Sequence, residues 1–226
     1  MDAARTLVMA CATVIEEMLP LMPAGMQHQV LDFGLHINPE MLRHRLQAAI
    51  DAASGQFDTI LLGYGLCSQA ILGIRANACQ LVVPRVHDCI AIFLGSSSAY
   101  SQQSHYEPGT YYLTKGWIEV GDTPFSEYER AAQRYGQERA MRMIKALLGN
   151  YKRLALIKTG QYDLERYQAY ARQCAQQFSL RYEEIEGSNS LIKKMLFGPW
   201  DEEFVVLQPG ESFQLEHFFS HDSTIE

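Results

Sequence analysis

Short apolar runs alternate with helical patterns along the first half of the chain. Four runs have the length and apolar content of buried strands: 6–10, 30–35, 59–62 and 80–83. The segments between them place apolar residues at three- and four-residue steps, or carry small residues, and predict helices at 11–19, 38–54 and 68–74. This alternation predicts βαβ units with right-handed crossovers and a parallel sheet.

A similar pattern resumes after a polar stretch at 96–104. The longest helical pattern covers 124–148 and stops at Gly149-Asn150. Strands are then expected at 153–157, 179–185 and 204–207, with helices at 163–178 and 188–196. We therefore expect an α/β fold with Rossmann-like parallel sheets flanked by helices. Two α/β halves, 1–120 and 121–226, are expected to enclose a cleft.

Composition narrows the class of protein. The 226 residues carry a formal net charge of −7, which argues against nucleic acid and anionic membranes as partners, because such binding neutralises phosphates with Lys and Arg. No apolar run approaches the roughly 20 residues that span a bilayer, and the first residues do not resemble a secretory signal. Five cysteines without short disulfide spacings favour a reducing, cytoplasmic location, where thiol clusters usually indicate metal or redox chemistry.

Three of the cysteines stand where predicted strands end. Cys11 follows the first strand, Cys67 closes a Gly-Tyr-Gly-Leu-Cys turn after the third, and Cys89 ends a His-Asp-Cys triplet after the fourth. Carboxyl ends of parallel strands share one sheet edge, where ligands bind in open α/β sheets. Cys11, Cys67 and Cys89, with His87 as a substitute or fourth ligand, match the Cys and His ligands of tetrahedral zinc. Cysteine also packs as a small apolar residue, and we expect that role for Cys79 and Cys174.

Other polar residues are predicted to lie near this edge. Tyr64 would lie beside the thiols, and Arg85 could hold a substrate carboxylate or lower thiol pKa values, or simply face water. We take both as candidate catalytic residues. Ser188 and Asn189 open a predicted helix whose N-terminus could contact a cofactor or substrate, although helix capping explains Ser188 equally well.

The strings that carry these residues resemble an uncharacterised prokaryotic family, domain of unknown function 1638. The resembling pieces are Ala10-Cys11, LGYGLC, PRVHDCIAIFLGS and PGTYYLTKGWIE, which cover the first 120 residues well and the second half loosely. The resemblance implies a genomic setting similar to that of corrinoid-dependent methyltransferase systems. The arrangement is also similar to that of enzymes in which three cysteines from several α/β units hold a [4Fe–4S] cluster, although those have three such units.

The leading functional expectation is a cytoplasmic metal protein, with zinc as the metal, that acts on a small molecule in one-carbon, methyl-transfer or thiol metabolism. One alternative is a [4Fe–4S] or thiol-redox enzyme. The other is a non-catalytic accessory protein that docks on a corrinoid protein or methyltransferase.

Overall fold

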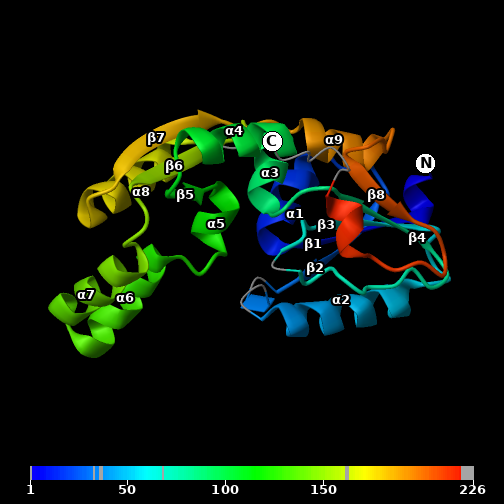
Figure 1. The fold of residues 1–226 in the computed structure, drawn as a ribbon, viewed down its shortest axis with the longest axis horizontal. Coiled ribbons are helices and arrows are strands. Elements are labelled where there is room, and N and C mark those ends of the chain that lie inside the picture. The colour runs from blue at the N-terminus through cyan, green and yellow to red at the C-terminus, as the bar shows by residue number, and fades with distance from the viewer. Residues whose placement is uncertain (1, 33, 36–37, 68, 161–162, 220–226) are drawn as a thin grey trace. The chain divides into compact units, whose positions relative to one another are not determined.

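Two separate sheets organise the protein. The computed structural model describes residues 2–32, 34–35, 38–67, 69–160 and 163–219. Its α/β fold contains a mostly parallel five-stranded sheet and a parallel three-stranded sheet (Figure 1). The compact units are Met1–Ser97 with Ser188–Glu226, and Ser98–Gly187. The chain thus leaves the first unit near residue 97 and returns to it near 188, a different division from a single boundary near 120.

The first unit is built on the strand order β2-β1-β3-β4-β8. Four of these strands run parallel: β1 (Thr6–Cys11), β2 (Gln27–Leu31), β3 (Thr59–Gly63) and β4 (Gln80–Pro84). The edge strand β8 (Phe204–Leu207) runs antiparallel to β4. The sequence-based expectation of strands at 6–10, 59–62, 80–83 and 204–207 is therefore confirmed.

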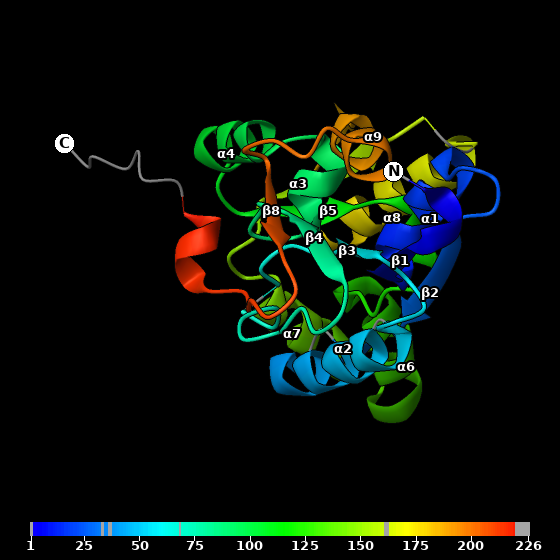
Figure 2. The ribbon, with the colours of Figure 1, turned by 90° about the vertical axis from the view of Figure 1, so that its right-hand side faces the viewer.

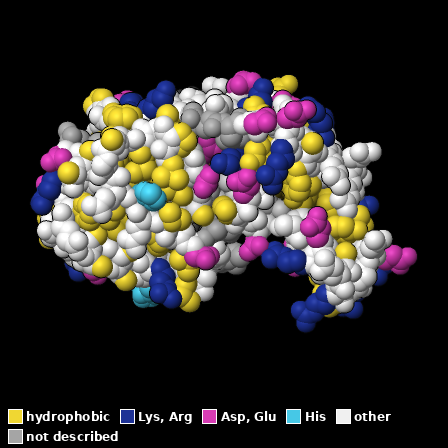
Figure 3. Space-filling model, turned by 180° about the vertical axis from the view of Figure 1, so that it is seen from behind, with side chains coloured by type: hydrophobic (Ala, Val, Ile, Leu, Met, Phe, Trp, Pro, Cys, Tyr) yellow, Lys and Arg dark blue, Asp and Glu magenta, His cyan; other side chains and the backbone are white. Residues whose placement is uncertain are grey.

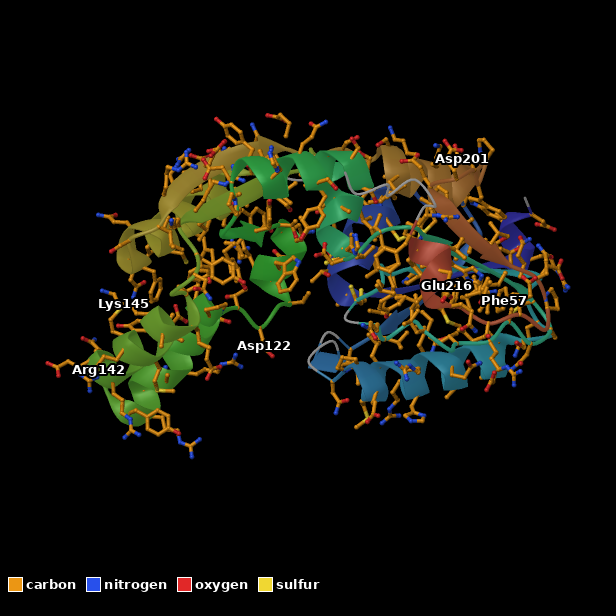
Figure 4. All side chains as sticks on the ribbon, in the orientation of Figure 1. Phe57, Asp122, Arg142, Lys145, Asp201 and Glu216 are labelled. Atoms are coloured by element: carbon orange, nitrogen blue, oxygen red, sulfur yellow. The ribbon has the colours of Figure 1, made fainter. Side chains whose placement is uncertain are left out.

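Helices cover both faces of this sheet (Figures 1 and 2). One face is covered by α2 (Pro39–Ala53), which starts where the Asn38 side chain accepts a 3.0 Å hydrogen bond from the amide of Met41. Its residues Leu46 and Ile50 pack into a core with alternate residues of β1, β3 and β4, and Figure 4 draws the side chains that fill this layer. The opposite face is covered by α1 (Ala12–Met18), α3 (Cys89–Leu94) and α9 (Ser190–Phe197). Short 3-10 helices occur at η1 (Ala3–Arg5), η2 (Leu19–Leu21) and η4 (Leu215–Phe218).

The second unit contains the strands β5 (Thr110–Leu113), β6 (Arg153–Lys158) and β7 (Arg181–Glu186), all parallel. Its core forms between β6 and the helices α6 (Pro124–Tyr135), α7 (Gln137–Leu147) and α8 (Glu165–Phe178). The remaining helices are α4 (Ser97–Tyr106) and α5 (Lys115–Glu119).

A buried cation lies at the start of β6. The Arg153 side chain is 2% exposed and forms an ion pair of 3.2 Å with Glu183. It also donates hydrogen bonds to Thr110 (2.8 Å) and Gln103 (2.9 Å). These bonds satisfy a charge that would otherwise be costly to bury.

Several sequence-based boundaries were wrong. The single helix expected at 124–148 divides into α6 and α7 at Gly136, whose φ of 83° does not continue a helix. Residues 69–74 form turns rather than a helix, and Ser68 lies outside the described residues. The second strand ends at Leu31 instead of continuing to residue 35, and the polar stretch after residue 96 forms α4. Among the described helices, none is long and apolar enough to cross a membrane.

Candidate metal site

The carboxyl ends of β1 and β3 place Cys11 and Tyr64 side by side. Ala10 is paired with Gly63 in the parallel register, so the next residues on the two strands are Cys11 and Tyr64. Both side chains face the α2 side of the sheet, where Tyr64 belongs to the core and Cys11 packs against it. A residue larger than glycine at position 63 would collide with Ala10 on the other face, since a Cβ there would lie 2.7 Å from the Ala10 Cβ.

The turn after β3 lies directly against the turn after β4. The amide of Leu66 donates to the carbonyl of Val86 (2.8 Å), and the amide of Cys67 donates to the carbonyl of His87 (3.0 Å). Gly65 permits this approach, because a Cβ at that position would lie 2.8 Å from the backbone nitrogen of Asp88. Cys67 adopts a left-handed backbone conformation with φ of 46°, which is strained for a residue with a Cβ. The two cysteine-bearing turns therefore form one structure.

Cys11 lies close enough to Cys67 to affect the pKa of its thiol. Burial is the main cause that raises the pKa of Cys67 to about 12, and the neighbouring Cys11 and Asp88 add to the shift. Burial also raises the pKa of Cys11, whose sulfur shares a 3.1 Å hydrogen bond with the Thr13 hydroxyl. At pH 7 a thiol with a pKa near 12 is ionised in roughly one molecule in 10⁵. Such a thiol is a poor nucleophile, whereas a bound metal ion displaces its proton.

Tyr64 contributes a buried hydroxyl to the same place. Burial, with Cys11 and Cys67 as further causes, raises its pKa well above the ordinary value, so the phenol is protonated at neutral pH. The side chain is 3% exposed, and its hydroxyl has no hydrogen-bond partner among the described residues. Within the part of the chain that the structure describes, this hydroxyl is therefore a donor without an acceptor.

Cys89 and His87 occupy the neighbouring turn in different ways. Cys89 is partly exposed at the first position of α3, and the Asp88 carboxylate caps that helix by accepting a 2.9 Å hydrogen bond from the amide of Ile90. The His87 side chain is exposed, and its ring lies 5.8 Å from the ring of Phe219, centroid to centroid. The carbonyl of His87 accepts the hydrogen bond from the amide of Cys67.

The described side chains do not form a closed metal centre. No three His, Cys, Asp or Glu side chains of the described ranges stand close enough together to hold a metal ion as they are placed. Topology nevertheless brings Cys11, Cys67 and Cys89 to the same edge of three adjacent strands.

The other predicted site residues are Arg85, Ser188 and Asn189. Arg85 reaches the carbonyl of Phe204 at the start of β8 (3.4 Å) and is not among the groups that perturb the pKa of Cys11 or Cys67. Ser188 packs on Gly95 at the C-terminal end of α3, the end opposite to Cys89, and its amide donates to Phe93. Asn189 precedes α9 without capping it through its side chain. The contacts described for Arg85 and Ser188 are thus with β8 and with α3.

Two residues at the site were not predicted from the sequence. Thr13 holds the Cys11 sulfur, and Asp88 raises the pKa of Cys67. The sequence offered a signal for Asp88 alone, because it lies between His87 and Cys89 and has the side chain of a helix cap.

Comparison with known proteins identifies the family of the chain. Residues 30–196 match the family described as "Protein of unknown function (DUF1638)", over most of the chain. The chain belongs to this family. The DUF1638 match contains Cys67, His87 and Cys89 but begins after Cys11, so it does not extend over the first strand. No curated protein and no solved structure matches the chain.

Charged side chains are mixed on the surface. Basic and acidic groups lie among one another on the face drawn in Figure 3, and many form ion pairs, such as Lys194 with Glu203 (2.5 Å) and Arg172 with Glu184 (2.8 Å). In Figure 4, Arg142 and Lys145 point away from α7. The opposite charges within each such pair compensate each other locally.

Proposed function

We propose that the DUF1638 protein binds a thiophilic metal ion, zinc, through Cys11, Cys67 and Cys89 at the carboxyl edge of the five-stranded sheet. Three protein ligands leave a tetrahedral zinc ion one open position, at which a small molecule can bind and be activated. The observation that carries this proposal is the joined pair of turns. Backbone hydrogen bonds fix the Cys67 turn against the residues that lead into Cys89, while Cys11 ends the adjacent strand.

The chemistry of the donor set supports a metal rather than a nucleophilic thiol. Cysteine sulfur is a soft ligand that suits zinc, and zinc binding releases the protons that burial otherwise keeps on the thiols. The left-handed backbone at Cys67 is a second supporting feature, because strained residues cluster at functional sites. A role in one-carbon, methyl-transfer or thiol metabolism, and a corrinoid protein or methyltransferase as partner, stay predictions from the family resemblance.

The test is element-selective metal analysis of protein purified without oxygen. The wild type should carry about one zinc ion per chain, and the substitutions Cys67→Ser and Cys89→Ser should each remove it. Cys79→Ser and Cys174→Ser are matched controls. The Cys79 sulfur shares a hydrogen bond with the Ser54 hydroxyl (3.6 Å), and Cys174 lies in α8 of the other unit. Circular dichroism would show that every variant is folded.

Two results would change the conclusion. Zinc retained after loss of Cys67 would rule out the site. Iron with sulfide in place of zinc would favour the alternative of a three-cysteine [4Fe–4S] cluster.

A further inference from the structure

The edge strand β2 of the five-stranded sheet is open to solvent. It pairs with β1 on one side, and no backbone group in the described part of the chain pairs with its other side. Gln27, His28, Gln29 and Val30 are all exposed, and Leu31 is buried. A strand in this position presents unpaired amide and carbonyl groups, which are a template for pairing with a further strand.

The other edge strands of the two sheets are protected. Three of the four residues of β8 are buried, and β5 has no exposed residue. The edge strand β7 is more exposed, but it carries four charged residues, Arg181, Glu183, Glu184 and Glu186. Burial and charge are two ways in which proteins prevent an edge from pairing with another chain. The exposed residues of β2 have neither form of protection.

The surface around β2 is also uncharged. Residues 18–31 contain no Asp, Glu, Lys or Arg, although a fifth of the whole chain is charged. Val30 is 45% exposed and is paired with Ala10, whose side chain lies on the α1 face of the sheet. Leu19, which is 41% exposed, directly follows α1. This segment lies at the outer edge of the sheet in Figure 2, and the first unit shows few charged side chains within its border in Figure 3. Depletion of charged residues is typical of the buried centre of a protein interface.

We propose that a second copy of the chain occupies this edge, and that its β2 pairs with the first β2 antiparallel about a two-fold axis. Each chain carries a formal charge of −7, so two copies repel each other least where both surfaces are uncharged. A two-fold contact brings the same patch of both copies together, which a patch without like charges permits. Full overlap of the two strands places Gln29 opposite its own counterpart and His28 opposite Val30. The sheets of the two copies then form one continuous sheet.

The test measures the mass of the full-length protein in solution. Sedimentation and light scattering from about 1 to about 100 μM, the range of weak to moderate affinities, should give twice the chain mass of 25.6 kDa at the upper end. Gln29→Lys should raise the dissociation constant at least about tenfold, because it sets two like charges opposite each other. Mixing Gln29→Lys with Gln29→Glu should restore the dimer, since opposite charges then face each other. Gln133→Lys, at an exposed position of α6 in the other unit, is the control and should leave association unchanged.

Hydrogen exchange of the wild type adds a measurement that needs no variant. The amides of 27–31 should exchange more slowly as the protein concentration rises, because pairing protects those that point outward. A wild type that is monomeric throughout this range would overturn the proposal and leave an extended peptide as the alternative occupant of the edge. A dimer that Gln29→Lys leaves intact, or that mixing the two variants does not restore, would overturn it as well. The same holds for exchange at 27–31 that does not depend on concentration.

Discussion

The close approach of the two cysteine-bearing turns predicts that Gly65 tolerates no side chain. In Gly65→Ala the new Cβ would lie 2.8 Å from the nitrogen and 2.9 Å from the Cα of Asp88, and 2.9 Å from the carbonyl oxygen of Val86. All three are backbone atoms, so the clash can be relieved only if the turns separate. Separation would lengthen the hydrogen bonds from Leu66 and Cys67 to the neighbouring turn, which measure 2.8 and 3.0 Å.

The magnitude follows from these contacts. Overpacking a filled site costs about 1–3 kcal/mol, and each weakened backbone hydrogen bond contributes up to about 1 kcal/mol. The alanine also restricts the unfolded chain, which offsets the loss by about 0.4–1 kcal/mol. We therefore expect the free energy of unfolding to fall by about 2–4 kcal/mol, measured by urea denaturation of the metal-free protein.

Gly25→Ala is the matched control. It has the same effect on the unfolded chain, and a Cβ at Gly25 would meet nothing within 4 Å, although its φ of 85° disfavours alanine. The control should cost only about 1–2 kcal/mol. If Gly65→Ala proves no more destabilising than Gly25→Ala, the turns do not pack as described and the geometric basis of the proposed metal site is lost.

Two further predictions concern titration and the second unit. The raised pKa of Cys67, about 12 against an ordinary 9.0, predicts slow alkylation by iodoacetamide in the folded, metal-free protein at pH 8 and a rise in rate toward pH 12. The unfolded chain loses the Cys67 proton at a lower pH than the folded protein does. The protonated thiol therefore contributes its full stabilisation below pH 9 and a declining one above it. Alkylation that is as fast at pH 8 in the folded protein as in urea would contradict the raised pKa. Arg153→Met should destabilise the second unit by about 2–4 kcal/mol in thermal or urea unfolding, because it leaves the polar partners of a buried guanidinium unsatisfied. The exposed Arg181→Met is the control, with an expected change of about 0.5 kcal/mol or less, and equal effects of the two substitutions would refute the argument.

The sequence by itself determined the α/β class and the positions of most buried strands. The apolar run 81–83 in β4 is recognisable because strand positions that are buried on both faces exclude polar residues. It also determined that Cys11 and Cys67 would share a sheet edge, since parallel strands end on the same side. Both conclusions follow from the local periodicity of apolar residues and from the rules for connecting parallel strands, which can be applied to one sequence.

The tertiary structure decided what local patterns do not encode. The run 204–207 reads as one more strand, but only long-range pairing placed it antiparallel to β4 in the first sheet, so that the unit closes with residues from both ends of the chain. Gly136 interrupts a helical pattern that is otherwise continuous, and its positive φ divides that pattern into α6 and α7, which pack against each other. The site shows the same limit. Sequence spacing does not record the distances between turns that are about twenty residues apart, because these distances depend on side-chain packing across strands. The positions of Thr13, Asp88 and the Tyr64 hydroxyl were therefore not predictable from the sequence.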